Sequence, residues 1–223
     1  MRRAAVLFII VFVLIVFSAI LLTNSIAIVQ RIARVSNVRG SVELQPLGAE
    51  AFKPVTADRN VRSGSVLRTG ADGRATLRWS DGTSIRVAPN TSLTIDRCRF
   101  DKRNASITSQ FTLSAGRVWV HVVKMLSAES KFEISTPIAT AGVRGTSFAI
   151  DVAPDGATSV LVYDGRVEVR ASGKPLGVKE GQAIAIAKGG DTSLRELSDK
   201  ERAEGQDALA TLPSDPSGPS PSG

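Results

Sequence analysis

The side chains that could perform chemistry are few in this sequence. Its 223 residues include one His, one Cys, one Tyr and two Met, whereas a zinc site needs three or four His, Cys or acidic ligands. A Ser–His–Asp or Cys–His triad would have to use His121, and no spacing sets a nucleophile or an orienting carboxylate beside it. No carboxylate pair suited to glycoside hydrolysis is recognisable either. We therefore expect a protein that is not an enzyme and has no catalytic residue, metal or cofactor.

The single Cys lies in a basic segment. Arg97 and Arg99 flank Cys98, and Lys102 and Arg103 follow it. Basic neighbours lower the pKa of a thiol, and an intermolecular disulfide is the alternative, but we expect a buried or simply unpaired Cys. The four cations indicate a basic contact patch for an acidic polymer of the cell envelope, with a solvated loop as the alternative. We expect no nucleic-acid partner, because the topology predicted from the N-terminus places this segment outside the cytoplasm.

The N-terminus is predicted to be a membrane segment. Residues 4–23 read AAVLFIIVFVLIVFSAILLT, and no charge occurs between Arg3 and Arg31. About 20 helical residues span the roughly 30 Å hydrocarbon core of a bilayer. We predict an uncleaved signal anchor over residues 1–30, a single transmembrane helix with its N-terminus inside. A signal peptide cleaved after residues 25–27 is the alternative.

A different periodicity begins after this segment. Short runs alternate apolar and polar residues, so that Ala75, Leu77 and Trp79, for example, fall on one face of a strand. Period-two alternation bounded by Gly, Pro, Asn and Asp is typical of β-strands. Over residues 31–195 we predict a mainly β domain without helices, of the β-sandwich or jelly-roll-like type, behind the one N-terminal transmembrane helix.

Asp-Gly pairs separate several of the predicted strands. They occur at residues 72–73, 81–82, 155–156 and 164–165. Both central residues of a type I′ turn need positive φ, which Asp and Gly tolerate best, so we predict such turns here. The pairs form two sets with the same nine-residue spacing. An internal duplication and two hairpins of similar length explain this repeat equally well.

The C-terminal segment, residues 196–223, has another character. Ser198 and Glu201 have the spacing of a capping box, which predicts a short polar helix over residues 198–210. The chain ends in LPSDPSGPSPSG, a composition rich in Pro, Ser and Gly that cannot bury a core. We expect this end to be a disordered tail.

The most distinctive stretch is residues 132–152, FEISTPIATAGVRGTSFAIDV. It is accompanied by LRTGADGRATLRWSDGTSIRVAPNTSL (67–93), GRVWVHV (116–122) and VLVYDGRVEVR (160–170). In this order the segments resemble the FecR-like domain family, and the resemblance covers residues 38–187. The residues of the family's core motif in this chain are Thr136, Pro137, Val143, Arg144, Gly145, Thr146 and Phe148.

The motif also has a physical interpretation of its own. Pro137 lacks an N–H and so marks a strand edge or entry. Gly142 and Gly145 bracket Arg144, which permits a bulge or a close approach of the backbone. We expect Arg144 to be structural, paired with a carboxylate or stacked on a Trp; the alternative is an Arg that binds an anion or a partner. Phe148 should lie on the buried face of its strand.

The resemblance implies a bacterial inner-membrane protein that takes part in signal relay. Well-understood members receive a signal from an outer-membrane receptor in the periplasm and control a sigma factor in the cytoplasm. Here only residues 1–3 precede the apolar segment, so we do not expect sigma-factor control by this chain. We expect a single-pass periplasmic binding module for an envelope protein, in signal relay or scaffolding. Because the net charge is +7, binding of peptidoglycan or another anionic envelope polymer is the alternative.

Overall fold

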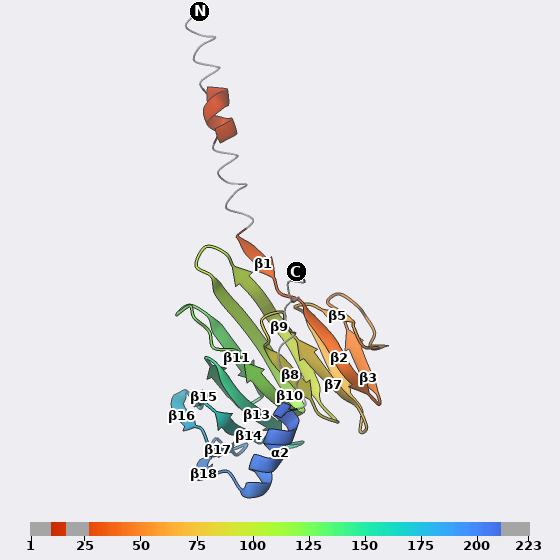
Figure 1. Cartoon of the computed structure of the whole chain (residues 1–223), viewed down its shortest axis with the longest axis vertical. Coiled ribbons are helices and arrows are strands. Elements are labelled where there is room, and N and C mark those ends of the chain that lie inside the picture. The colour runs from red at the N-terminus through yellow and green to blue at the C-terminus, as the bar shows by residue number, and fades with distance from the viewer. Residues whose placement is uncertain (1–9, 17–26, 211–223) are drawn as a thin grey trace, which may run out of the picture.

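The computed structural model describes residues 10–16 and 27–210 (Figure 1). Residues 10–16 are helical, and residues 27–210 form a β structure followed by one helix. No helix within these described ranges is long and apolar enough to cross a membrane. The predicted transmembrane segment, residues 4–23, lies mostly outside the described residues, as does the tail after residue 210.

The strands belong to two sheets, which we call sheet A and sheet B. In spatial order, sheet A contains β4 (Lys53–Pro54), β3 (Val42–Gln45), β6 (Ser65–Thr69), β9 (Ser92–Asp101), the first part of β10 (Ser106–Val122), β11 (Lys131–Ser135), β12 (Ala139–Val143), β15 (Arg166–Ala171) and β16 (Lys174–Lys179). Strand β1 (Ile28–Gln30) pairs with the last residues of β9. The prediction of a mainly β domain is confirmed.

Sheet B is formed by the remaining strands. In spatial order it contains β5 (Asn60–Val61), β2 (Ala33–Arg39), β7 (Arg74–Arg78), β8 (Ser84–Val87), the second part of β10, β13 (Thr146–Val152), β14 (Thr158–Asp164), β17 (Gln182–Ile186) and β18 (Thr192–Glu196). From β11 onward the hairpins alternate between the sheets: β11–β12 and β15–β16 lie in sheet A, β13–β14 and β17–β18 in sheet B.

Strand β10 belongs to both sheets. It pairs with β9 up to Ala115 and with β8 and β13 beyond Gly116. Gly116 has φ +83°, and a Cβ there would lie 2.6 Å from the carbonyl O of Asn90, so only glycine fits this bend. The bend brings the two ends of β10 to the same end of the domain and joins the sheets into one curled, barrel-like system.

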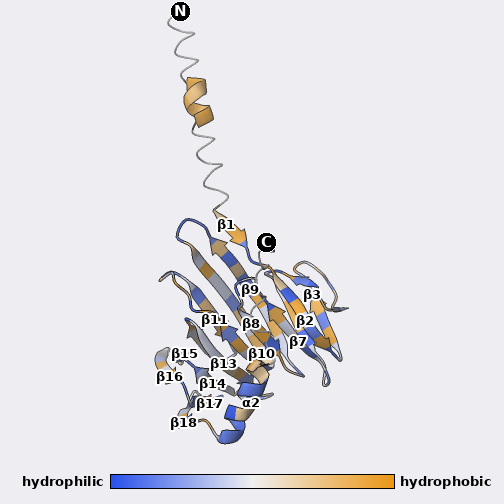
Figure 2. Ribbon diagram, viewed as in Figure 1, coloured by the Kyte–Doolittle hydropathy of each residue, from blue (hydrophilic) through white to orange (hydrophobic). Residues whose placement is uncertain are grey.

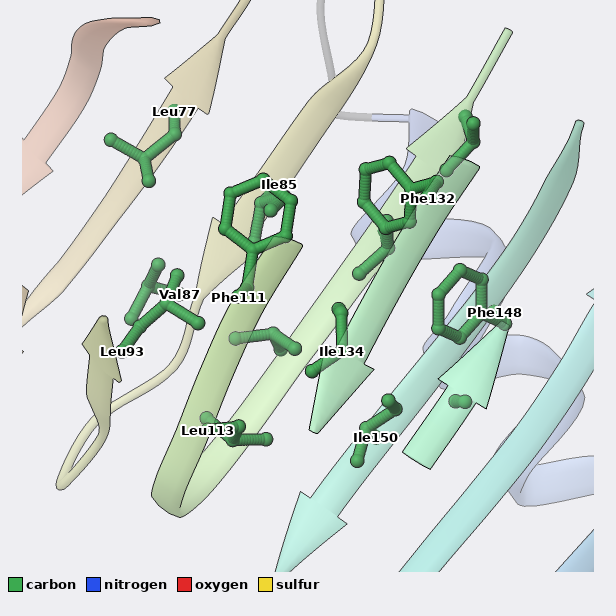
Figure 3. Close-up of a cluster of buried hydrophobic side chains, with 14 of the residues drawn as sticks. Leu77, Ile85, Val87, Leu93, Phe111, Leu113, Phe132, Ile134, Phe148 and Ile150 are labelled. Carbon is green, nitrogen blue, oxygen red and sulfur yellow. The ribbon is translucent and has the colours of Figure 1, made fainter. Parts of the chain in front are cut away.

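The two sheets enclose one hydrophobic core. Figure 3 shows side chains of both sheets meeting there, among them Leu77, Ile85, Val87, Leu93, Phe111, Leu113, Phe132, Ile134, Phe148 and Ile150. The aromatic rings pack edge to face and tilted: Phe111 lies 5.5 Å from Trp79 and 5.2 Å from Phe132 between centroids. Apolar and polar residues alternate along the strands, as Figure 2 shows for β2 and β10. The predicted inward face of Ala75, Leu77 and Trp79 is confirmed.

The Asp-Gly turns differ from the prediction. None of the four Asp residues has positive φ, so the type I′ assignment is wrong. In the loop from Trp79 to Thr83 only Gly82 takes the left-handed conformation, with φ +89°, and the Asp81 carboxylate accepts a bond from the Thr83 N–H at 3.1 Å. A type I turn followed by a left-handed Gly explains this geometry, because the Asp side chain stabilises the turn and the Gly alone supplies positive φ.

Helix α2 (Asp199–Ala210) follows sheet B. Its capping box is formed: the Ser198 N–H donates to Glu201 Oε2 at 2.9 Å, and the Glu201 N–H donates to Ser198 Oγ at 3.3 Å. The helix packs on β10, β13 and β14, and Figure 1 shows it lying over the outer face of sheet B. Within the described part of residues 31–195 there is no helix, as the alternation predicted.

Candidate functional site

The motif residues Thr136 and Pro137 form the turn between β11 and β12. The Thr136 N–H donates to the Ala139 carbonyl at 2.8 Å, and the Ala139 N–H donates to Thr136 Oγ1 at 3.1 Å. Pro137 is exposed in this turn. No hydrogen bond between strands needs an N–H at this position, so proline fits here. These two residues therefore shape a hairpin of sheet A.

A second group of motif residues holds the crossing from sheet A to sheet B. Val143 and Phe148 are buried, and Phe148 has no exposed surface. The Thr146 hydroxyl donates to the Arg166 carbonyl at 3.0 Å. Gly145 has φ +88°, and a Cβ there would lie 2.7 Å from Lys124 Cα, so the close approach expected at this glycine occurs. This part of the motif determines how the backbone passes between the sheets.

Arg144 does not lie where we expected it. Its side chain is exposed and donates to the Ala128 carbonyl. Among the described residues, neither a carboxylate nor a Trp contacts it, so the expectation of a paired or stacked Arg is wrong. The physical reason is its place at the tip of the β12–β13 connection, beside Gly145, where the side chain points away from both sheets. Arg144 is thus free to contact a partner on its exposed side.

Beside Arg144 the outer face of sheet A is hollowed, and we call this depression the Gly142 hollow. Its volume is about 530 Å³. The residues that line it come from the loop before β11, from β11, β12 and β15, and from the β12–β13 connection with the start of β13: Ala128, Glu129, Ser130, Lys131, Phe132, Glu133, Gly142, Val143, Arg144, Gly145, Thr146, Arg166 and Glu168. Four of the seven motif residues are among them. Residues of the family motif therefore line an accessible surface.

Gly142 forms the floor of this hollow. It pairs with Glu133 of β11 on one side and with Glu168 of β15 on the other. A Cβ at Gly142 would meet only the Glu168 carbonyl O, at 3.9 Å, and its φ is not left-handed. The backbone thus does not require glycine here; the missing side chain simply opens the surface between two longer neighbours. The bulge expected at Gly142 is absent from the register of β11, β12 and β15.

Two acidic side chains that line the hollow, Glu133 and Glu168, have cationic partners on the same face. Lys131 Nζ lies 2.8 Å from Glu133, and an Arg170 guanidinium N lies 2.7 Å from Glu168. Gln110 Nε2 also donates to Glu133 at 3.2 Å. The rim therefore offers hydrogen-bond donors and acceptors, together with side chains of both charges, around Gly142. Such a surface can bind by hydrogen bonds and ion pairs, but it contains no nucleophile activated by a base.

The predicted basic patch is divided in two by the structure. Arg97 and Arg99 lie on β9 opposite Gln110 and Thr108 of β10, on the outer face of sheet A. Lys102 and Arg103 lie in the β9–β10 turn.

Within that turn Arg103 has a partner. Its guanidinium lies 2.9 Å from the Asp101 carboxylate, and the hydrogen bond that it donates lowers the pKa of Asp101 and raises that of Arg103. Lys102 is exposed. Two of the four cations therefore lie on strand β9 and two lie in the turn that follows it.

Cys98 faces the core between Arg97 and Arg99. It is 1% exposed, and burial raises the pKa of its thiol to about 12, against the opposing effect of Arg31. The expected buried, unpaired Cys is confirmed, and alternation along β9 turns the two flanking Arg side chains outward. The thiol is not placed for reaction or disulfide exchange.

His121 is exposed on β10, and its Nδ1 lies 3.0 Å from the Ser147 hydroxyl. Trp79 is in the core, whereas Trp119 is half-buried beneath α2. Among the described residues no group of three His, Cys, Asp or Glu side chains could hold a metal ion. The Gly142 hollow is thus the place where the motif and an open surface coincide.

Comparison with known proteins agrees with this geometry. Residues 65–168 match the family model described as FecR protein. This part of the chain is therefore similar to the FecR family. The match spans β6 to β15 and includes the hollow together with the whole motif.

Solved structures show the same fold. Two crystal structures of a candidate anti-sigma factor from Parabacteroides distasonis, at 2.50 and 1.65 Å, each match 66% of this chain with a TM-score of 0.51. Their sequence identities to this chain are 18% and 17%, and the matches cover 63% and 64% of those proteins, less than two thirds of their length. No curated protein sequence matches this chain.

Proposed function

We propose that this chain is a membrane-anchored, extracytoplasmic FecR-domain module that binds an envelope protein, either in signal relay or as a scaffold. Three observations support the proposal: the apolar run over residues 4–23, the FecR-family match, and the fold shared with candidate anti-sigma factors. The proposed role is binding, because the residues that line the hollow offer hydrogen-bonding groups and side chains of both charges.

The Gly142 hollow is the observation on which the binding proposal depends. It lies on an outer sheet face that α2 does not cover, and motif residues line it. Strand β16 lies two strands away, at the edge of the same sheet. An edge strand can accept a strand from a partner, and pockets beside it give specificity. We propose that the partner presents an extended segment with side chains of both charges across β12 and β15.

Photo-crosslinking in intact cells tests this proposal. A photoreactive amino acid replaces Glu168 on the rim of the hollow, and in a control chain it replaces Lys188, which is exposed in the β17–β18 loop. We expect one envelope protein to be attached at position 168, not at 188, and to be lost when Gly142→Leu fills the hollow. Identical products at both positions, or products insensitive to Gly142→Leu, would contradict the proposal. Peptidoglycan fragments at position 168 would instead support the polymer-binding alternative.

The anchor is tested separately. The full-length chain should stay with membranes during alkaline carbonate extraction, whereas deletion of residues 4–23 should release it. Protease added to spheroplasts should digest the domain but not a cytoplasmic marker. Release of the full-length chain by carbonate, or protection of the domain in intact spheroplasts, would refute the anchored extracytoplasmic topology.

A further inference from the structure

The chain enters the β domain beside the basic β9–β10 turn. The Ala27 carbonyl accepts a hydrogen bond from the Lys102 N–H at 2.8 Å, and Ile28 pairs with Asp101. The apolar run ends at residue 23, only four positions before Ala27. Figure 1 shows β1, the first strand of the domain, and the β9–β10 turn together at one end of the domain. A bilayer that held residues 4–23 would therefore lie next to this turn.

The loop over residues 123–130 lies at the same end. The bend of β10 at Gly116 returns the strand, so that the loop after Val122 meets the turn before Ser106. The Ser127 hydroxyl donates to the Asn104 carbonyl at 3.3 Å, and the Asn104 amide contacts Glu129. Two surfaces that are distant in sequence thus form one end of the domain, which we call the N-proximal end.

This end exposes large apolar side chains. Leu126 is 96% exposed at the tip of the loop, and Ile28 and Val29 of β1 are 48% and 41% exposed. Leu126 has the highest exposure among the large apolar side chains of the described residues. An isolated exposed Leu needs no explanation. Here, however, three exposed apolar residues lie at the end of the domain to which the apolar run is joined in sequence.

Cations accompany these apolar side chains. Lys102, Arg103 and Lys124 are exposed at the N-proximal end and outnumber its two acidic residues, Asp101, which pairs with Arg103, and the exposed Glu129. Basic residues near an anionic bilayer surface contribute about 1 kcal/mol each, and apolar side chains beside them enter the headgroup boundary. The combination matches a lipid surface in both its charge and its apolar layer.

We propose that the N-proximal end binds the anionic phospholipid surface of the bilayer, with Leu126 among the acyl chains and Lys102, Arg103 and Lys124 on the headgroups. This inference rests on the proposed membrane anchor. The long strands β9 and β10 run away from this end (Figure 1), so a domain seated in this way would point the outer faces of both sheets sideways. The Gly142 hollow would remain open to a partner while the domain is held upright.

Site-specific fluorescence on the full-length chain tests the contact. Cys98→Ser removes the native thiol, and Leu126→Cys is labelled with an environment-sensitive dye. The control is Ala187→Cys, in the β17–β18 loop. The pairing of β10, β13, β14 and β17 places this loop beside the end of β13 at Val152, at the end of the domain opposite the N-proximal end. The proteins are reconstituted in phosphatidylcholine vesicles with and without phosphatidylglycerol. Thermal unfolding curves check that each variant is folded.

The expected result is a blue-shifted emission and quenching by lipid-borne quenchers at position 126, in phosphatidylglycerol vesicles only, with no change at position 187. High salt should weaken the effect. Lys102→Gln should lower the ratio of inserted to free label about fivefold, the equivalent of about 1 kcal/mol, whereas the matched Lys188→Gln should leave it unchanged.

Three results would overturn the proposal. One is equal emission at positions 126 and 187 in phosphatidylglycerol vesicles. Another is an effect at position 126 that does not depend on phosphatidylglycerol, salt or Lys102. The third is shielding of position 126 only in native membranes, which would mean that a protein covers this end. Failure of the full-length chain to enter vesicles at all is scored independently by flotation, and refutes the anchor on which the inference rests.

Discussion

The outer faces of the two sheets are built from the same alternating strands but have different surroundings. Sheet B is covered by α2, which packs on β10, β13 and β14. Sheet A has no such cover in the described part of the chain, and its face contains the Gly142 hollow. The outer face of sheet B is thus part of the packed domain, whereas the outer face of sheet A remains available for binding.

The helix is held on sheet B by both packing and charge. Gly205 of α2 sits directly on the Tyr163 ring, where an added Cβ would overlap the ring atoms, and burial raises the pKa of Tyr163 to about 12. Arg117 of β10 lies 2.6 Å from Asp151 and 2.8 Å from Glu204 of the helix, and its guanidinium lies 5.6 Å from the centre of the Trp119 ring. These contacts join residues far apart in the sequence.

On sheet A the charges are paired with close neighbours instead. Lys131 pairs with Glu133 on the same strand, and Arg170 pairs with Glu168. Both residues of the second pair are more than half exposed, so they add little to stability. Substitutions on sheet B should therefore change stability, and substitutions on sheet A should change binding.

The largest expected effect is that of Gly205→Leu. The new side chain has no room against Tyr163, and overpacking of this kind costs roughly 1–3 kcal/mol. We expect α2 to leave sheet B at a lower denaturant concentration than in the parent protein. The fluorescence of Trp119, which lies beneath the helix, would report this step. The variant Trp119→Phe identifies the part of the signal that comes from Trp79. An unfolding curve identical to that of the parent would show that α2 does not depend on this contact.

Arg117→Ala should have the next largest effect. It removes charge-assisted hydrogen bonds to Asp151 and Glu204, and since the Arg117 side chain is about one third exposed, we expect a loss of about 1–2 kcal/mol. The matched variant on the other face, Arg170→Ala, should cost about 0.5 kcal/mol or less. Equal losses, measured by chemical denaturation, would remove the distinction between the two faces.

A smaller effect should follow from acid. The hydrogen bond from Arg195, with further bonds from Ser198, lowers the pKa of Glu201 from 4.5 to about 2 despite the opposing effect of burial. The associated stability is complete above about pH 4.5 and is lost as the pH falls toward 2, because the unfolded chain takes up the proton first.

Since Glu201 borders solvent, we expect this acid-sensitive part to be about 1 kcal/mol or less. Denaturation curves recorded over the acid range measure it. Glu201→Gln should remove it, whereas Glu50→Gln, an exposed residue of the β3–β4 loop, should not. Persistence of the full pH dependence in Glu201→Gln would assign it to another group.

The smallest stability effect is expected for Gly142→Leu. A Cβ at this position meets only one atom at ordinary contact distance, and surface changes of this kind stay within about 0.5 kcal/mol. The same substitution should abolish the crosslink at position 168. A stability loss as large as that of Gly205→Leu would show that Gly142 is required for folding and not for an open surface.

Much of this arrangement could be predicted from local patterns. Alternation in residues 74–79 identified an inward face, and the spacing of Ser198 and Glu201 identified the start of α2. The motif over residues 132–152 pointed to the FecR family. A signal for the hollow was also present, since Gly142 lies within a predicted strand, but a glycine there could equally have marked a bulge.

Local patterns were sufficient to predict the β class and the C-terminal helix, because these depend on period-two alternation and on a cap four residues long, and the contiguous motif indicated the likeness to the FecR family. Only the tertiary structure decided that Cys98 points inward, that Arg144 points outward and that Gly142 opens onto an uncovered face. It also decided that the β9–β10 turn and residues 123–130 meet. The physical reason is that burial and exposure are properties of contacts between distant segments, which strand pairing and the bend at Gly116 create.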